Sequence, residues 1–297
     1  MQLITAYITV ILIWSTTPLA IQWSSESVGY LFGICSRFML GAFFALSLIM
    51  ILGKKLPMEK KAIQTYLASG LGITFAMLSV YWAAQYIPSG WVSMIFGITP
   101  IITGLFAMKL LGERGLNLFR LIAIALSMLG LYIMLDTGLQ YNSNTYLGII
   151  GVLASALFYS LSMVLVKKIN ADIDTYATVA GTMLVACSML TLVWIVFGTS
   201  VPTDIPIRAG LSIFYLALIG SVLGFLLFYY VLKRVEAMRV SLITLVTPIF
   251  ALLIGNVINN EPLSWNIIFS CFLILSGLLF FEFEGAIRRM KIINIED

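Results

Sequence analysis

The sequence predicts an all-α polytopic membrane protein with ten transmembrane helices, arranged as a 5+5 inverted-topology repeat. Apolar residues of the set AVILMFWYC make up 61% of the 297 residues, and charged residues make up only 10%. A soluble domain is about half apolar and one quarter charged, so this composition excludes a soluble enzyme, a disordered chain and a nucleic-acid binder. Two further observations complete the prediction: ten apolar stretches can each cross a bilayer, and the second half of the chain matches the first in register.

Each membrane span needs about 20 mostly apolar residues. Each must be a helix, because lipid offers no hydrogen-bonding partner to backbone N–H and C=O groups. Turn residues and charges divide the chain into ten spans, which cover Leu3–Gln22, Tyr30–Leu52, Tyr66–Ile87, Gly90–Leu111, Leu118–Leu135, Leu147–Ile169, Tyr176–Phe197, Gly210–Leu232, Val240–Ile258 and Asn266–Phe281.

The basic residues predict how these spans are oriented. All but two of the 17 lysines and arginines fall in alternate loops or in the C-terminal tail; the exceptions are Arg37, inside the second span, and Arg208. Short loops rich in Lys and Arg face the cytoplasm, so both termini are expected there, with the chain in the inner membrane of a bacterium. The first apolar run lacks a basic n-region and a cleavage site, which indicates a retained span rather than a signal peptide.

An internal repeat appears when the chain is shifted by 148 residues. The matched pairs include Tyr81 and Tyr229, Thr99-Pro100 and Thr247-Pro248, and Glu113 and Glu261. Proline inside a helix removes a hydrogen bond and kinks the chain, so kinks are expected at Pro100 and Pro248. The alternative is a pair of kinked helices with no role in function.

The repeat divides the chain into a first five-helix unit in residues 1–138, a second unit in residues 146–284 and a cytoplasmic tail in residues 285–297. Because five is an odd number of spans, the second unit enters the membrane in the opposite orientation. Inverted repeats whose broken or kinked helices meet near the midplane are typical of alternating-access transporters.

Metal and cofactor chemistry finds little support in the sequence. The chain has no histidine, which is the commonest metal ligand and the commonest general base near neutral pH. Its three cysteines, Cys35, Cys187 and Cys271, lie in apolar runs without the spacing of a disulfide framework or a zinc site. We therefore expect no cofactor, no metal and no catalytic residue.

Several short motifs together resemble the EamA-type members of the drug/metabolite transporter superfamily. The motifs are Trp14-Ser15, Arg37-Phe38, Thr99-Pro100 followed by Glu113, and Thr247-Pro248 followed by Glu261. The resemblance covers nearly the whole chain and implies two EamA-like five-helix repeats. It also implies a central cavity built from spans 1–4 and 6–9, with spans 5 and 10 at the periphery, and transport of small metabolites, often amino acids or drug-like compounds, outward.

Polar and aromatic residues inside the spans are the candidate substrate-binding residues, because such side chains avoid lipid where a cavity is available. We expect Trp14, Tyr81 and Tyr229 to line one central space. Ser and Thr can instead bond the carbonyl group one turn back without further role. The full candidate set is Trp14, Thr17, Arg37, Tyr81, Gln85, Ser93, Tyr159, Tyr229, Ser241 and Thr244.

Arg37 has two interpretations that the sequence leaves open. It lies about seven residues past Tyr30, and so roughly 10 Å along the second span. Its side chain could be structural, extending to the interface or pairing with backbone, or it could be the counter-ion of a substrate carboxylate. No Asp or Glu lies in the middle of a span, which argues against an antiporter coupled through a glutamate at the membrane centre.

The leading hypothesis is a secondary transporter of small amphipathic metabolites, an exporter that works by alternating access around a central cavity. The alternatives are a membrane-embedded enzyme acting on a lipid-linked substrate and a non-transporting membrane scaffold. The expected partners are a small-molecule substrate and the lipid bilayer, with no nucleic acid, and the expected state is a monomer or a homodimer.

Overall fold

The computed structural model describes residues 3–112, 118–197, 201–232, 237–277 and 279–280. Helices and connecting loops make up this part of the chain, and it contains no β-strand. The helices are α1 (Leu3–Ser25), α2 (Tyr30–Ile51), α3 (Lys60–Ala83), α4 (Ser89–Phe96), α5 (Thr99–Leu111), α6 (Leu118–Tyr141), α7 (Thr145–Ile169), α8 (Thr175–Phe197), α9 (Ile207–Tyr215), the π-helix η1 (Leu216–Leu223), α10 (Gly224–Leu232), α11 (Ala237–Asn259) and a last helical segment, Trp265–Gly277.

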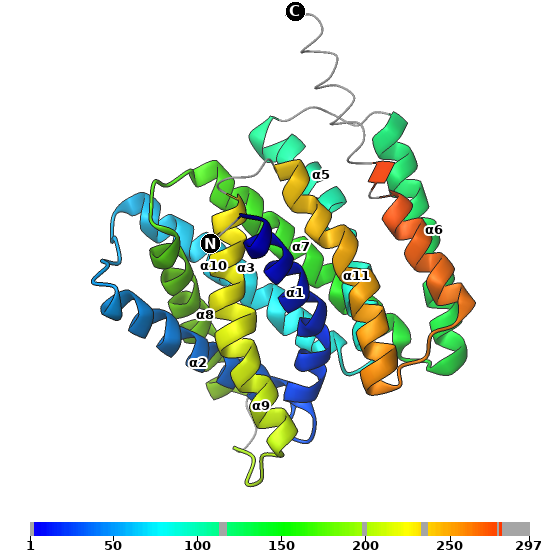
Figure 1. Cartoon of the computed structure of the whole chain (residues 1–297), viewed down its shortest axis with the longest axis horizontal. Coiled ribbons are helices and arrows are strands. Elements are labelled where there is room, and N and C mark those ends of the chain that lie inside the picture. The colour runs from blue at the N-terminus through cyan, green and yellow to red at the C-terminus, as the bar shows by residue number, and fades with distance from the viewer. Residues whose placement is uncertain (1–2, 113–117, 198–200, 233–236, 278, 281–297) are drawn as a thin grey trace, which may run out of the picture.

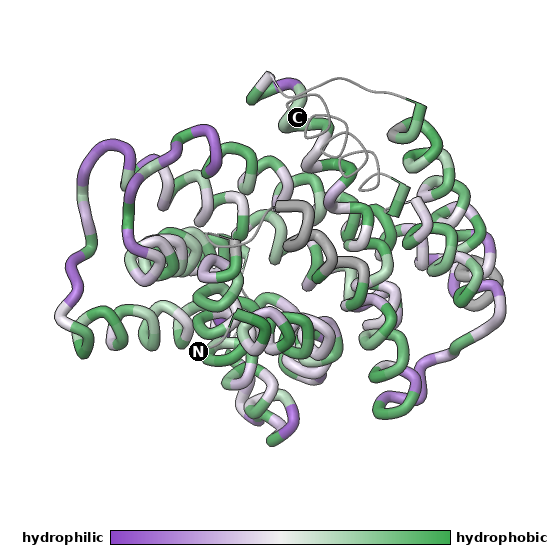
Figure 2. Tube along the Cα trace, turned by 45° about the horizontal axis from the view of Figure 1, so that its top comes forward, coloured by the Kyte–Doolittle hydropathy of each residue, from purple (hydrophilic) through white to green (hydrophobic). Residues whose placement is uncertain are grey.

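Seven helical stretches are long and apolar enough to cross a membrane. Two of them are composite: α4 and α5 together form Ser89–Leu111, and α9, η1 and α10 together form Ile207–Val231. Three shorter apolar helices, Leu121–Thr137, Val246–Asn259 and Trp265–Gly277, bring the number in the described residues to ten. The chain is therefore an all-helical membrane protein, and Figure 2 shows its hydrophobic residues on the helices and its hydrophilic residues mainly in the loops.

The third span begins earlier than the sequence predicts. Helix α3 starts at Lys60 and ends at Ala83, whereas the prediction was Tyr66–Ile87. The apolar run marks only the part of a helix that lipid covers, and the backbone hydrogen bonds of α3 continue past it into a segment that begins with two lysines. At the other end, Tyr86 N donates to Ala83 O, so the helix gives way to a turn before Pro88.

The fourth span is broken where the sequence places a proline. α4 ends at Phe96, α5 begins at Thr99, and Pro100 occupies the first turn of α5. Proline suits a helix start, where its missing N–H needs no partner, and it disfavours helical conformation in the residue before it. Pro248, its counterpart in the repeat, lies inside α11, which continues as a helix through it. The two matched prolines thus have different local structures.

The eighth span contains an eight-residue π-helix, η1, between α9 and α10. π-helical turns are rare and occur often at functional sites. Gly220 lies in this segment next to Ser221, and both residues face α1 and α2: a Cβ added at Gly220 would lie 3.8 Å from Thr17 Oγ1, and Arg37 Nε donates to Ser221 Oγ. The π-helix therefore brings backbone without a side chain close to the only charge inside the second span.

Small residues allow the spans of the two halves to approach closely. A Cβ added at Gly72 in α3 would overlap the side chain of Ser162 in α7. The same pair of helices is joined where Ser155 Oγ donates to Ala76 O at 2.7 Å. Small residues at helix contacts are typical of membrane bundles, in which close backbone approach and interhelical hydrogen bonds hold helices together.

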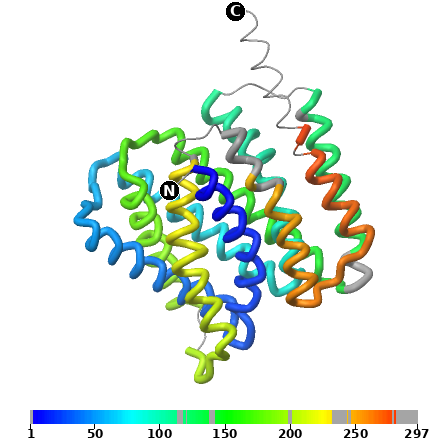
Figure 3. Tube along the Cα trace, viewed as in Figure 1, coloured from blue at the N-terminus to red at the C-terminus, as the bar shows by residue number. Residues whose placement is uncertain are grey.

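Helix α6 and the last helix, Trp265–Gly277, form a pair at one side of the molecule (Figures 1 and 3). A Cβ added at Gly130 would lie 2.8 Å from Ser270 O, and one added at Gly277 would lie 2.5 Å from Ser127 Oγ. These two helices correspond to spans 5 and 10, whose peripheral position the family resemblance implies. The other helices form the main bundle, and α1, α3, α7, α10 and α11 lie nearest its centre (Figure 1).

Candidate substrate-binding region

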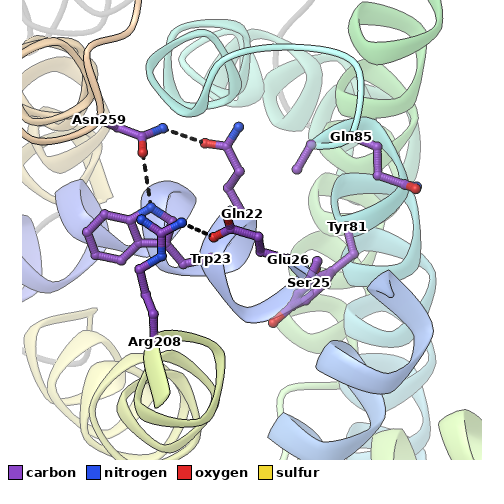
Figure 4. A pocket seen from close by; sticks show the side chains of 9 residues that line it. Gln22, Trp23, Ser25, Glu26, Tyr81, Gln85, Arg208 and Asn259 are labelled. Atoms are coloured by element: carbon purple, nitrogen blue, oxygen red, sulfur yellow. Dashed lines mark hydrogen bonds and ion pairs between the residues drawn. The ribbon is translucent and has the colours of Figure 1, made fainter. Parts of the chain in front are cut away.

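A pocket of about 380 Å³ lies where α1, α3 and α11 end and α9 begins (Figure 4). This volume falls within the range of small-molecule sites, about 300–1,000 Å³. The pocket lies at the membrane face whose loops carry few basic residues, so the sequence predicts that it opens outward. Its lining residues are Gln22, Trp23, Ser25, Glu26, Tyr81, Ala84, Gln85, Arg208 and Asn259.

Polar contacts connect three helices around this outer pocket. Asn259 of α11 accepts a hydrogen bond from Trp23 Nε1 at 3.1 Å and donates to Gln22 Oε1 at 3.2 Å, both on α1. Arg208 of α9 forms an ion pair with Glu26, and its guanidinium carbon lies 5.3 Å from the centroid of the Trp23 ring. The pocket therefore presents an acid, a base and an indole ring to solvent (Figure 4).

Tyr81 connects the outer pocket to the interior of the protein. Its side chain lines the pocket, yet the residue is 0% exposed. Its hydroxyl accepts a hydrogen bond from Ser24 Oγ at 3.4 Å, and its ring centroid lies 6.0 Å from the guanidinium carbon of Arg37. Tyr81 thus stands between the pocket and Arg37. Gln85, one turn further along the chain, is exposed and lines the same pocket.

Arg37 is buried, with 2% of its surface exposed. Its Nε donates to Ser221 Oγ at 3.0 Å, and Nη1 lies 3.9 Å from the sulfur of Met77. Within the described residues, no carboxylate lies within ion-pair distance of the guanidinium group. Arg37 therefore joins α2 to η1 through a single hydrogen bond to oxygen.

The remaining aromatic candidates lie away from the outer pocket. Trp14 packs on Phe228, with ring centroids 4.9 Å apart, and more loosely on Phe225 at 6.5 Å. Tyr229 packs on Phe228 at 5.7 Å. We call Trp14, Phe225, Phe228 and Tyr229 the inner aromatic cluster. Tyr159 of α7 packs on Phe96 of α4 instead, with ring centroids 5.7 Å apart.

The hydroxyl candidates divide into three groups. Thr17 Oγ1 donates to the carbonyl oxygen of Ile13 at 2.8 Å, which is the local bond that serine and threonine often form in helices. Ser93 is buried in α4, where its carbonyl oxygen accepts from Gly97 N at the break in the span. Ser241 and Thr244 belong to α11, but their side chains lie outside the described residues.

Most residues of this region were not among the sequence-based candidates, which included only Tyr81 and Gln85 of the pocket lining. The others are Gln22, Trp23, Ser25, Glu26, Ala84, Arg208 and Asn259, together with the neighbouring Glu261. Arg208 was treated only as an exception to the charge rule, although a single base on the outer face near an acid could have indicated an ion pair. Glu261 was noted for its match to Glu113 in the repeat. In the structure it is buried and accepts hydrogen bonds from Ser89 and Gly90 at the start of α4.

Metal binding finds no site in this region. In the part of the chain that the structure describes, no group of three or more His, Cys, Asp or Glu side chains could hold a metal ion.

Together, the membrane-spanning helices and a pocket of small-molecule size at their outer ends define a multi-pass membrane protein of the transporter type. Comparison with known families agrees: the EamA-like transporter family matches residues 2–136 and again residues 146–283. The chain belongs to the EamA-like transporter family, which is a family of transporters and not of enzymes. The two matches also indicate an internal repeat.

Individual relatives are distant but cover most of the chain. The chain is 23% identical to the uncharacterized transporter YoaV of Bacillus subtilis (strain 168), over 95% of its own length and 97% of YoaV. It is 27% identical to the uncharacterized inner membrane transporter YedA of Escherichia coli (strain K12), over 85% of its length and 81% of YedA. A crystal structure of a protein 20% identical in sequence superposes with a TM-score of 0.67, covering 93% of this chain and 94% of that one, and this likeness concerns the fold.

Proposed function

We propose that this protein is a secondary transporter that exports small amphipathic metabolites, such as amino acids or drug-like compounds, by alternating access across a bacterial inner membrane. The observation that carries the proposal is the outer pocket, which is open at one membrane face and ends at the buried Tyr81–Arg37 pair. A substrate site that is accessible from one side and closed toward the other is what alternating access requires in any single state.

An inverted repeat is the symmetry that would let the same chain open to the other side, and the packing between the two halves supports it. α1 packs on α11. In the repeat, α1 corresponds to α7 and α11 corresponds to α4 and α5, and α7 also packs on α4 and α5. α3 packs on α7. The segment that corresponds to α3, made of α9, η1 and α10, packs in the same way on α1, which corresponds to α7. Contacts that occur in exchanged pairs are expected of two units related by a two-fold axis.

The matched prolines lie on either side of the contact between α4 and α11. A Cβ added at Gly97, in the break of the fourth span, would lie 3.7 Å from Cγ of Pro248. A two-fold axis in the membrane plane would bring these segments together, because residues near the middle of matched spans approach each other across it. The difference between the break at Pro100 and the continuous helix at Pro248 is the kind of asymmetry that separates an outward-open from an inward-open state.

The proposed orientation follows from the distribution of charge. With both termini in the cytoplasm, the pocket faces outward and the Lys54–Asp174 ion pair, between the end of α2 and the start of α8, faces inward. The outward direction of transport rests on the family resemblance. The membrane assignment is supported by the similarity to YedA of Escherichia coli, which is named as an inner membrane transporter.

Flux through purified protein in proteoliposomes tests this function. Liposomes are loaded with unlabelled amino acids or aromatic cations, and uptake of the labelled compound by exchange is measured against protein-free liposomes. Transport predicts exchange that saturates with substrate. Exchange no faster than in protein-free liposomes for every compound of the panel would contradict the proposal.

Access to the outer pocket provides a second test. In a variant with all three native cysteines replaced by alanine, Gln85→Cys is expected to react with a membrane-impermeant thiol reagent added outside intact cells, and transported substrate should slow the reaction. Lys168→Cys, at the exposed end of α7, is the matched control and should react only after the membrane is opened. The opposite pattern would contradict the proposed orientation.

A further inference from the structure

Arg37 carries a charge that the described protein does not neutralise. It lies in the outer half of α2, its residue is 2% exposed, and no acidic side chain in the described part of the chain reaches it. An isolated charge in a medium of low dielectric constant is costly unless it is paired and hydrogen-bonded. Such residues inside membrane spans usually mark a substrate or ion pathway.

Some N–H donors of the guanidinium group also have no oxygen acceptor among the described residues. Arginine has five N–H donors in a planar fork that matches a carboxylate. Nε donates to Ser221 Oγ, and Nη1 has only the Met77 sulfur at 3.9 Å, which is a weak acceptor. The outer edge of the fork, formed by Nη1 and Nη2, therefore lacks an oxygen acceptor among the described residues.

Gly220 places backbone without a side chain next to this edge, and a Cβ added there would lie 3.3 Å from Leu216 Cδ2. A Cβ added there would lie 3.8 Å from Nη2 of Arg37 and 3.8 Å from Oγ1 of Thr17, at ordinary contact distance from both. The π-helix η1 thus holds bare backbone where α1 and α2 face it. Tyr81 borders the same guanidinium group from the side of the outer pocket, so a solute that displaces the Tyr81 ring would reach Arg37.

We infer that the transported substrate carries a carboxylate, which binds the Nη edge of Arg37 beside Gly220. This inference rests on the proposed function and specifies its substrate class. Ser221 holds Nε and so orients the fork, and bidentate pairing of arginine with a carboxylate supplies both strength and geometry. The apolar part of the substrate would lie toward Trp14 of α1, which belongs to the inner aromatic cluster. Trp14 lies close to the same segment of the eighth span, since a Cβ added at Gly224 would lie 3.3 Å from its Nε1.

The test compares acids with their matched amides. Purified protein in detergent is titrated with three pairs: phenylalanine and phenylalaninamide, leucine and leucinamide, and 3-phenylpropionate and 3-phenylpropionamide. Binding is followed by calorimetry. We expect at least one acid to bind about tenfold or more tightly than its amide, because hydrogen bonds to charged groups are the strong ones. If no acid binds more tightly than its amide, the inference is overturned.

Variants then locate the carboxylate. Arg37→Gln should abolish the acid preference and Arg37→Lys should retain part of it. Gly220→Ala is the variant least disturbing to folding, since its methyl group would meet atoms at 3.3 Å or more. It should weaken acid binding several-fold, because the methyl group occupies the proposed carboxylate position, whereas a purely structural Arg37 would leave binding in Gly220→Ala unchanged. Acid preference that survives both Arg37→Gln and Gly220→Ala overturns the inference.

The outer cation supplies the matched control. Arg208→Gln removes the base of the outer pocket and should preserve the acid preference; loss of the preference in this variant alone would assign the carboxylate to the outer pocket and overturn the inference. Failure of the proposed function is distinguishable, because it would leave acid binding in detergent intact while exchange in proteoliposomes is absent. Equal exchange of acids and amides would instead contradict the inference and leave the function standing.

Discussion

The carboxylate of Glu261 closes the N-terminus of α4, although 172 residues separate it from Ser89. Oε1 accepts from the backbone N of Ser89 at 2.9 Å and from its hydroxyl at 2.6 Å, and Oε2 accepts from Gly90 N at 3.0 Å. Amide groups in the first turn of a helix have no partner within the helix, and a negative charge there is favourable. A residue of the second half therefore completes a helix of the first half.

The same glutamate organises the end of α11. Asn259 Nδ2 donates to Oε1 at 3.2 Å, Asn256 Nδ2 donates to the carbonyl oxygen of Glu261 at 2.8 Å, and Glu261 N donates to Gly255 O at 3.1 Å. Because Asn259 also contacts Gln22 and Trp23, the outer ends of α1, α4 and α11 form one network next to the outer pocket. This network joins the ends of three helices next to the outer pocket.

Replacing Glu261 should lower stability in a graded way. Glu261→Ala leaves two buried amide groups and a hydroxyl without an acceptor, which is expected to cost roughly 3 kcal/mol of unfolding free energy. Glu261→Gln keeps one acceptor oxygen and sets an NH2 group against a second donor, so its cost should be smaller. Thermal unfolding in detergent, followed by intrinsic fluorescence, measures the order. Equal stability of Glu261→Ala and the wild type would show that the network does not hold the helix ends.

The ion pair at the mouth of the outer pocket should contribute much less. The side chains of Arg208 and Glu26 are 53% and 48% exposed, and exposed pairs contribute about 0.2–1 kcal/mol. Arg208→Ala should therefore shift the unfolding temperature only slightly in the same assay, and added salt should reduce the difference further. A loss as large as that of Glu261→Ala would mean that the stacking of Arg208 on Trp23, and not the ion pair, dominates.

Tyr81 should act as a cover over Arg37, and its ring should matter more than its hydroxyl. In a variant without native cysteines, Met77→Cys places a thiol beside Arg37. Tyr81→Ala is expected to let a small thiol reagent added outside reach that cysteine, whereas Tyr81→Phe should leave it protected, because the bond from Ser24 to the hydroxyl is long. Reaction rates in intact cells provide the measurement; equal rates in the two variants would exclude this role.

The all-helical architecture and its ten apolar helices were predictable because lipid imposes them, although only seven of these helices are long enough, as described, to cross a membrane. Any apolar run of sufficient length must become a helix where water cannot satisfy the backbone. The break near Pro100 was predictable for a similarly local reason. The π-helix at Leu216–Leu223 was not predictable, because its apolar sequence suits an α-helix equally well.

The site was harder to predict because its contacts are long-range. The sequence suggested that Tyr81 and Tyr229 would face one cavity, but the outer pocket is lined by Tyr81 and not by Tyr229, which packs in the inner aromatic cluster. The proposed inverted repeat would account for this separation: matched residues near a helix end would lie at opposite depths in the membrane, and only those near the middle would meet. The sequence marked Glu261 only as a repeat match, because its partners Ser89 and Gly90 lie in the other half of the chain.

Substituting the matched prolines should change stability in opposite directions, because their positions in the helices differ. Pro248 lies inside α11, where it lacks the N–H that would donate to the carbonyl group of Thr244. Pro248→Ala restores this donor and should raise the unfolding free energy by roughly 1–2 kcal/mol. Pro100 lies in the first turn of α5, where no donor is needed, so Pro100→Ala mainly increases the freedom of the unfolded chain and should lower stability by roughly 0.5–1 kcal/mol. Unfolding temperatures of the two variants, measured side by side in detergent, give the sign of each change. Shifts of the same sign would show that the two prolines have equivalent structural roles, although one lies at a break and the other inside a continuous helix.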